Sequence, residues 1–189
     1  RAFYLHSVKS VEESVISTIA AHDPDSLTPY WAIAESNAMG NLLWRKFKRT
    51  LQGEGALGDR LNRVYRRLRR DFGYVIFLGA DCPQIPPETL SEAAAILKLG
   101  LEKNEPRFVM GRALDGGYYL FGGNAALPPE AWTQTPYSVA STASIFAEFL
   151  KKKGTLHELQ TLFDVDTAED LTRLANTPLR PTSAHQALV

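Results

Sequence analysis

The stretch Tyr74-Val-Ile-Phe-Leu-Gly-Ala80, continued by Asp81-Cys-Pro83, decides the fold class of this chain. It is continuously apolar rather than alternating, and it stands between Gly73 and the Asp-Cys-Pro turn. A short run of this kind is typical of a strand that is buried on both faces of a parallel sheet. We therefore expect a central parallel strand here, with Asp81 at its carboxyl end.

Helical patterns flank this strand on both sides. Residues 57–72 place apolar side chains at spacings of three and four, and a helix with the same period follows Pro86-Pro87. We also expect helices at residues 2–20, 141–152 and 167–174, and strands at residues 30–35, 107–112 and 118–121. This alternation predicts an α/β fold, a three-layer sandwich with a mostly parallel central sheet. In such sheets the ligand crevice lies beyond the carboxyl ends of the strands.

Composition excludes several classes of protein. The 189 residues form one domain, which we place at residues 1–175, with a flexible tail at 176–189. Lys plus Arg and Asp plus Glu both number 21, so no net charge favours nucleic acid or a membrane surface. No window reaches the ~20 apolar residues of a transmembrane helix, and residues 1–20 lack the pattern of a signal peptide. The single cysteine, Cys82, forms no intramolecular disulfide, so we expect a cytoplasmic protein.

The loop Gln52-Gly-Glu-Gly-Ala-Leu-Gly58 has the glycine spacing of dinucleotide-binding proteins. Its context does not fit that class, because the segment Arg45-Lys-Phe-Lys-Arg-Thr50 precedes it, where an apolar strand is required. A glycine loop before a helix still approaches a phosphate or a base closely through its backbone N–H groups. Arg60, in the first turn of the helix, offers a bidentate guanidinium to a phosphate. We interpret the other arginines of this helix as a solvated face.

Acidic residues follow the expected strands. Asp81 is either a turn residue beside Pro83 or a ligand for Mg²⁺ or Mn²⁺, which select carboxylate oxygens. In the segment 163–170, Asp164 and Asp166 alternate along an extended backbone, so only one of them faces a given side. We choose Asp166 to converge on the same metal as Asp81. Asp115, in an Asp-Gly-Gly sequence, has the composition of a β-turn.

Four motifs in order resemble the bacterial family called domain of unknown function 2064. They are Gln52-Gly-Glu-Gly-Ala-Leu-Gly-Asp-Arg60, Leu78-Gly-Ala-Asp-Cys-Pro83, Leu114-Asp-Gly-Gly-Tyr-Tyr-Leu120 and Asp164-Val-Asp-Thr-Ala-Glu-Asp-Leu171. The family is also described as glycosyltransferase A-like and is linked to arsenosugar biosynthesis. The resemblance spans about residues 2–175. It implies the nucleotide-diphospho-sugar transferase fold, with distant similarity to molybdenum-cofactor guanylyltransferases and CMP-KDO synthetases.

The resemblance also implies roles for particular residues. In those relatives two aspartates, which correspond by motif to Asp81 and Asp166, hold the divalent metal. The base-recognition loop corresponds to residues 52–58, so the expected nucleotide-binding residues are Gln52, Gly53, Gly55, Gly58 and Arg60. Such proteins usually begin with a strand and a basic loop, Lys-x-Pro-x-x-Gly-x-Val-Lys-Thr-Arg, which grips the phosphates. The sequence shown starts at what resembles the helix after that loop, and residues 132–138 depart from the commoner Trp-Gly-Thr pattern.

The leading hypothesis is a metal-dependent glycosyltransferase that uses a nucleotide-diphospho-sugar donor and Mg²⁺ or Mn²⁺. Asp115 then acts as the general base towards a hydroxyl of the acceptor. Nucleotidyl transfer to a sugar- or alcohol-phosphate uses the same two metal-binding carboxylates and is the first alternative. A catalytically silent nucleotide-binding domain is the second. The sequence leaves the donor base, the donor sugar, the acceptor and the oligomeric state open.

Overall fold

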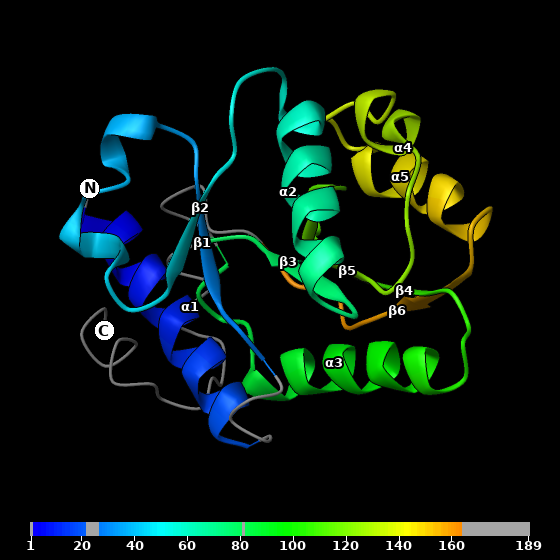
Figure 1. Ribbon diagram of the computed structural model, residues 1–189, viewed down its shortest axis with the longest axis horizontal. Helices are drawn as coiled ribbons and strands as arrows, with labels where there is room; N and C mark the ends of the chain where they lie inside the picture. Colours follow the sequence, from blue (N-terminus) through cyan, green and yellow to red (C-terminus); the bar gives the residue numbers. More distant parts are fainter. Residues whose placement is uncertain (1, 22–26, 81, 164–189) are drawn as a thin grey trace.

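The computed structural model describes residues 2–21, 27–80 and 82–163, which form two β-sheets enclosed by helices (Figure 1). The helices are α1 (Ala2–Ala20), α2 (Leu57–Asp71), α3 (Pro87–Glu102), α4 (Pro129–Thr133) and α5 (Thr142–Lys151), with two short 3-10 helices, η1 (Ser36–Ala38) and η2 (Leu42–Trp44). The strands are β1 (Tyr30–Ile33), β2 (Lys48–Leu51), β3 (Val75–Leu78), β4 (Arg107–Arg112), β5 (Tyr118–Gly123) and β6 (Thr155–Glu158). None of the described helices combines the length and the apolar character needed to cross a bilayer.

The strands form one parallel pair and one mixed sheet. β1 pairs with β2 in parallel, and the four-stranded sheet has the order β3-β5-β4-β6. Within it β5 is antiparallel to both β3 and β4, whereas β4 and β6 are parallel. Three of its four strands therefore run in the same direction, and β5 is a hairpin return inserted between β3 and β4.

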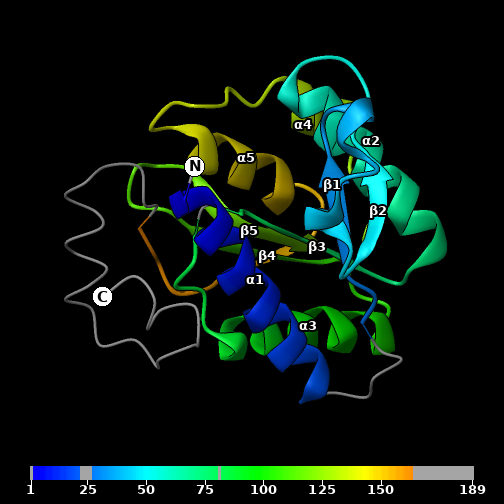
Figure 2. The same ribbon diagram turned by 90° about the vertical axis from the view of Figure 1, so that its left-hand side faces the viewer.

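Helices cover both faces of the four-stranded sheet and complete three layers. Figure 1 shows α3 below this sheet and α2, α4 and α5 above it, while Figure 2 shows α1 crossing in front of α3. Alternate residues of β4 pack to opposite sides, as a pleated strand requires: Phe108 and Met110 towards α4 and α5, and Val109 towards α3. Trp132 of α4 is fully buried in the first of these two cores.

Hydroxyl groups attach α1 to the segment that follows β3. Ser7 donates a hydrogen bond to the carbonyl of Ala80, and Ser14 Oγ donates to the carbonyl of Ile85 at 2.8 Å. These serine side chains are buried although they are polar. Because the irregular segment after β3 has carbonyl groups outside any ladder, buried donors on α1 satisfy them. The early turns of α1 thus lie at the carboxyl end of β3.

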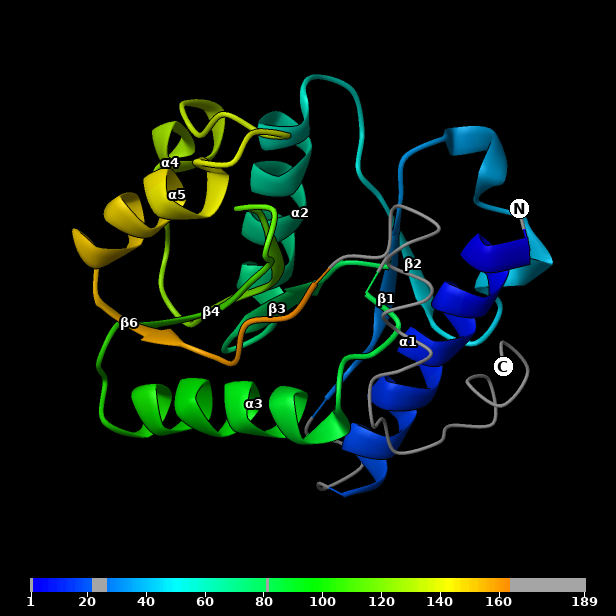
Figure 3. The ribbon, with the colours of Figure 1, turned by 180° about the vertical axis from the view of Figure 1, so that it is seen from behind.

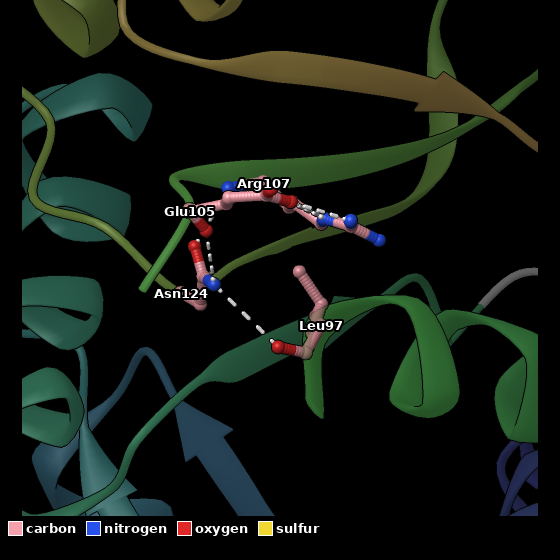
Figure 4. A network of polar contacts seen from close by, with 4 residues as sticks. All are labelled: Leu97, Glu105, Arg107 and Asn124. Atoms are coloured by element: carbon pink, nitrogen blue, oxygen red, sulfur yellow. Dashed lines mark hydrogen bonds and ion pairs between the residues drawn. The ribbon is translucent and has the colours of Figure 1, made fainter. Parts of the chain in front are cut away.

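A buried asparagine fixes the opposite end of the sheet (Figure 4). Asn124, directly after β5, accepts a 2.7 Å hydrogen bond from the backbone N–H of Arg107 and donates one of 2.9 Å to the carbonyl of Glu105. Arg107 and Glu105 also form an ion pair at 2.6 Å. These contacts hold the turn between α3 and β4 against the end of β5.

The structure confirms the predicted α/β architecture and departs from the sequence expectation in its pairings. β3 corresponds to the predicted central strand, but its only partner among the described strands is the antiparallel β5. The short strands β2 and β6 were not predicted. Their residues, Lys-Arg-Thr-Leu and Thr-Leu-His-Glu, are too polar to give an apolar strand signal. The predicted helix at 167–174 lies outside the described residues.

Candidate functional site

The glycine loop between β2 and α2 is held by arginine side chains of the helix that follows it. Gly53 and Gly55 both have positive φ angles, 80° and 106°. Arg63 Nη1 donates to the carbonyls of Gln52 (2.7 Å) and Glu54 (2.9 Å). The positive φ of Gly53 favours glycine there, and a Cβ atom on Gly53 would also lie 2.5 Å from that nitrogen, so a side chain would displace Arg63.

Arg60 lies at the same loop, and only one of its three side-chain nitrogens makes a hydrogen bond to a described residue. Its Nε donates to the carbonyl of Gly55 at 2.8 Å, which orients the guanidinium towards the loop. Its two terminal nitrogens make no hydrogen bond to any described residue. Those nitrogens remain available for a phosphate, the ligand that a guanidinium fork fits best. Arg63 was expected on a solvated face, and its role in bracing the loop was missed.

Gln52 is tied to β1 by two hydrogen bonds. Its backbone N–H donates to the carbonyl of Ile33 at 2.8 Å, and its side-chain Nε2 donates to the carbonyl of Ala32 at 2.9 Å. The amide nitrogen of the side chain is therefore engaged within the protein. The second N–H and the carbonyl oxygen of this amide make no hydrogen bond to a described residue.

Gly58 lies inside α2 rather than in the loop, and it is buried. A Cβ atom there would lie 2.3 Å from the carbonyl oxygen of Trp132 and 3.2 Å from the ring of Tyr137. The absence of a side chain thus lets α2 approach α4 closely. Burial raises the pKa of Tyr137 to about 12, so this phenol is neutral near pH 7.

A polar pocket of about 470 Å³ opens beside the glycine loop, where β1 and β2 end. Its lining comes from the loop, from Arg60 and from the segment that enters η1, and it consists of Ala34, Glu35, Ser36, Asn37, Leu51, Gly53, Glu54, Gly55 and Arg60. Glu35, Ser36 and Asn37 were not predicted as site residues, because the expected strand extended to residue 35, whereas β1 ends at Ile33. All three therefore follow the observed strand, and such positions line the crevice of an α/β sheet. Carboxylate, hydroxyl and amide groups here offer hydrogen-bond donors and acceptors to a ligand.

Asp115 is exposed at the tip of the β4–β5 hairpin. Its Oδ1 accepts a 2.8 Å hydrogen bond from the backbone N–H of Gly117, the local pattern by which aspartate stabilises a turn. Gly116 has a φ of 92°, and a Cβ there would lie 2.0 Å from the carbonyl oxygen of Ala140. The turn therefore has a fixed shape, and the second carboxylate oxygen of Asp115 makes no hydrogen bond to any of the residues that the structure describes.

The segments next to the three candidate carboxylates meet. Cys82, the neighbour of Asp81, is fully buried, and its Sγ donates to the carbonyl of Phe163 at 3.6 Å. Gln84 Nε2 donates to the same carbonyl. Leu162 forms a parallel bridge with Ala113, two residues before Asp115, and its carbonyl accepts a 2.9 Å hydrogen bond from the N–H of Leu114. Three segments that are far apart in the sequence therefore meet at the end of the sheet where β3 and β4 terminate.

The two predicted metal ligands, Asp81 and Asp166, lie outside the described residues. Among residues 2–21, 27–80 and 82–163, no group of three or more His, Cys, Asp or Glu side chains is arranged to hold a metal ion. The described part of the site therefore contributes the glycine loop, Arg60, the polar pocket and Asp115.

Comparison with known proteins identifies the family to which this chain belongs. A family model described as "uncharacterized protein conserved in bacteria (DUF2064)" matches residues 16–139, so the chain belongs to this family. A solved structure from Desulfovibrio desulfuricans G20, assigned provisionally as a nucleotide-diphospho-sugar transferase, is similar with a TM-score of 0.77. The match has 22% sequence identity and covers 99% of this chain and 80% of that one.

A second solved structure, CMP:2-keto-3-deoxy-manno-octonic acid synthetase complexed with CTP, is similar with a TM-score of 0.54. This match has 12% identity and covers 89% of this chain and 85% of that one. Among curated proteins, none matches the sequence with statistical significance. The fold is that of nucleotide-diphospho-sugar transferases, as the sequence motifs implied.

Proposed function

We propose that this protein is a metal-dependent glycosyltransferase that uses a nucleotide-diphospho-sugar as its donor. The observation that carries the proposal is the position of the braced glycine loop. Gln52 and Arg60 line one groove together with Ala80, the last described residue before Asp81. A nucleotide held by the loop therefore lies next to the carboxyl end of β3, where the candidate metal ligands follow in sequence.

The donor nucleotide would use the described part of this site. The base enters the polar pocket, where Glu35 and Asn37 offer hydrogen-bonding partners, and the phosphates lie against the terminal nitrogens of Arg60. The fixed backbone of Gly53 and Gly55 lets the nucleotide approach without steric conflict. The loop needs little reorganisation on binding, because Arg63 already braces it.

Asp81 and Asp166 would hold Mg²⁺ or Mn²⁺, since carboxylate oxygens are the ligands that these hard cations select. The contact of Cys82 with Phe163 supports this assignment, because it joins the two segments that contain the aspartates. The ion, when bound, supplies charge stabilisation for a diphosphate leaving group.

Asp115 would accept the proton of the acceptor hydroxyl as general base. Asp115→Asn is an informative variant, because an amide oxygen can still accept the hydrogen bond from the N–H of Gly117 that shapes the turn. We expect kcat to fall by about 10²–10⁴ with an unchanged thermal midpoint. Full activity in this variant would remove Asp115 from the mechanism.

Calorimetric titration of nucleotide-diphospho-sugars, with and without Mn²⁺, tests the metal assignment. Asp81→Asn and Asp166→Asn should each weaken Mn²⁺ binding about tenfold or more. Asp71→Asn is the matched control, because Asp71 is an exposed carboxylate at the end of α2, and it should leave binding unchanged. Unaltered Mn²⁺ binding in both site variants would overturn the proposed metal site.

Nucleotidyl transfer is the second candidate, favoured by the fold shared with a synthetase solved with CTP. The two reactions release different products. A nucleoside diphosphate released from a nucleotide-sugar supports glycosyl transfer, whereas pyrophosphate released from a nucleoside triphosphate supports nucleotidyl transfer. Binding without turnover of either donor, across a panel of acceptors, would support a catalytically silent nucleotide-binding domain.

A further inference from the structure

The segment from residue 45 to residue 71 concentrates the positive charge of this chain. It holds ten of the 21 basic residues but only three of the 21 acidic ones, Glu54, Asp59 and Asp71. The net charge of zero therefore conceals an uneven distribution, in which the rest of the chain is acidic. A local field of this kind attracts an anionic partner although the protein as a whole is neutral.

The basic segment lies on one side of the molecule. It comprises β2, α2, the glycine loop between them and the residues that lead into β2. Figure 2 shows α2 and β2 together, on the right in that view. Figure 3, seen from behind, has α5 on the near side and α2 on the far side. An anionic partner would therefore meet one side of the protein, away from α5.

Three arginines of α2 are exposed and have no counter-charge. Arg66, Arg67 and Arg70 make no hydrogen bond or ion pair to any residue that the structure describes. Arg70 follows Arg66 by four residues and Arg67 by three, so the three side chains share one helix face. Like charges at these spacings repel one another. A surface that serves only solubility typically intersperses both signs and avoids this repulsion.

Aromatic contacts bring a cation of β2 to the end of α2. Lys48 is exposed, and its Nζ lies 5.8 Å from the centre of the Tyr30 ring. The Tyr30 ring in turn lies 6.0 Å from that of Phe72, the residue directly after α2. Lys48 therefore adds its charge at the end of the helix that carries Arg70.

Two exposed leucines accompany the basic residues. Leu42, in η2 and three residues before the exposed Arg45, is 74% exposed, and Leu57, the first residue of α2, is 46% exposed. Neither belongs to the two buried cores. Cations combined with exposed apolar side chains are typical of proteins that lie on an anionic bilayer.

A nucleic acid fits the same surface less well. Proteins that bind single strands place aromatic rings among the basic groups, so that bases stack on them. The only aromatic residue of α2 is Tyr65, which is 1% exposed. Exposed leucines also gain nothing from contact with a phosphate backbone, whereas they gain from contact with acyl chains.

We propose that the side formed by α2 and β2 is a docking surface for an anionic phospholipid bilayer. Arg66, Arg67 and Arg70 contact the lipid phosphates, which a guanidinium fork binds in a bidentate manner. Leu42 and Leu57 enter the boundary between headgroups and acyl chains, so the protein lies on the membrane without spanning it. The lipid phosphates also relieve the repulsion among the unpaired arginines.

Flotation with lipid vesicles tests the proposal without any nucleotide, so its outcome is independent of the proposed function. The vesicles consist of phosphatidylcholine alone or of an equimolar mixture of phosphatidylcholine and phosphatidylglycerol. We expect binding to the mixed vesicles only. Binding should weaken as the salt rises from about 0.01 M to about 0.1 M, because the screening length falls from about 30 Å to about 10 Å. A protein that does not bind the mixed vesicles at the lower salt concentration would overturn the proposal.

The combined variant Arg66→Gln, Arg67→Gln and Arg70→Gln tests the helix face directly. It should bind the mixed vesicles about a hundredfold more weakly, since each cation near an anionic surface contributes about fivefold. Its thermal midpoint should not fall, because the three side chains are exposed and glutamine has a similar helix propensity.

The matched control is the combined variant Lys151→Gln, Lys152→Gln and Lys153→Gln. It removes the same number of exposed positive charges, at the end of α5. The control should bind the mixed vesicles as wild type does. An equal loss of binding in both combined variants would overturn the proposal, because net charge alone would then explain the attraction.

Leu42→Ser distinguishes a bilayer from other polyanions. This substitution should weaken binding to the mixed vesicles by about threefold or more, because it removes apolar area that would enter the bilayer. Vesicle binding that is unchanged by Leu42→Ser would overturn the proposal. An oligonucleotide, single- or double-stranded, that binds as tightly as the mixed vesicles would also overturn it, in favour of a nucleic acid.

Discussion

Replacing Gly58 by alanine separates a packing role from a nucleotide-binding role. In a helix, alanine is favoured over glycine by about 1 kcal/mol, so propensity alone predicts a more stable protein. The structure predicts the opposite. The new Cβ would lie 2.3 Å from the carbonyl oxygen of Trp132, a backbone atom that moves only if α4 shifts.

The cost of the steric clash with Trp132 should exceed the gain in helix propensity. Overpacking in a close-packed core typically costs about 1–3 kcal/mol. The obstacle here is a backbone oxygen that cannot rotate away, so we expect the upper part of this range, about 2–3 kcal/mol, from which the gain in helix propensity is subtracted. We therefore expect a net loss of ~1–2 kcal/mol for Gly58→Ala. With an m-value of about 2–3 kcal/mol/M, the urea midpoint falls by roughly 0.3–1 M.

Urea denaturation followed by circular dichroism, with nucleotide affinity measured under native conditions, provides the assay. Gly40→Ala is the matched control, because nothing lies within 4 Å of a Cβ built at Gly40. That control should be unchanged or up to about 1 kcal/mol more stable. A Gly58→Ala protein that is as stable as wild type would refute the close approach of α2 to α4. A large loss of nucleotide affinity with unchanged stability to urea would instead assign Gly58 to the nucleotide-binding site.

Three further measurements test other contacts. Arg63→Ala removes two hydrogen bonds to exposed loop carbonyls, so we expect ~1 kcal/mol or less of destabilisation but faster proteolysis at Gly53–Gly55; unchanged cleavage would contradict the brace. Trp132→Ala should cost about 3–5 kcal/mol in urea denaturation, because the indole is fully buried among aromatic rings. Burial raises the pKa of Tyr137 to about 12, so the unfolded chain ionises first and stability falls as pH rises from about 10 towards 12. Tyr137→Phe should lessen that fall, and an identical pH profile would argue against burial of the phenol.

The longer helices and the longer strands were predictable because each has a clear period or apolar run, whereas the five-residue helix α4 is too short for a period and was not predicted. The structure confirms the strand at residues 107–112 with the same limits and the helix at residues 57–72 to within one residue. Pairing was not predictable, because an apolar run does not encode its partner. The antiparallel insertion of β5 depends on the tight turn at Gly116, whose backbone is set by contact with Ala140 from a distant part of the chain.

The site was predictable where the residue types of a motif determine its local conformation. The glycines at positions 53 and 55 predicted a loop before a helix, and both lie between β2 and α2, where they have positive φ angles. The brace by Arg63 was not predictable, since its spacing along α2 matches that of solvated arginines. Asn37 carried a usable signal, its position after the expected strand, but polar residues after strands are common. Glu35 carried none, because the strand was expected to extend to residue 35 and ends at Ile33.

The separate pairing of β1 with β2 affects how the 189-residue chain unfolds. No ladder hydrogen bond connects these strands to β3 within the described structure, so the small sheet can open while the four-stranded sheet stays intact. Trp31 and Trp44, with ring centroids 5.2 Å apart, report on the first event, and Trp132 reports on the second. Single-tryptophan variants should then give two urea midpoints, the lower one for the small sheet, and the stability losses expected for Gly58→Ala and Trp132→Ala belong to the higher one, because both residues pack between α2 and α4.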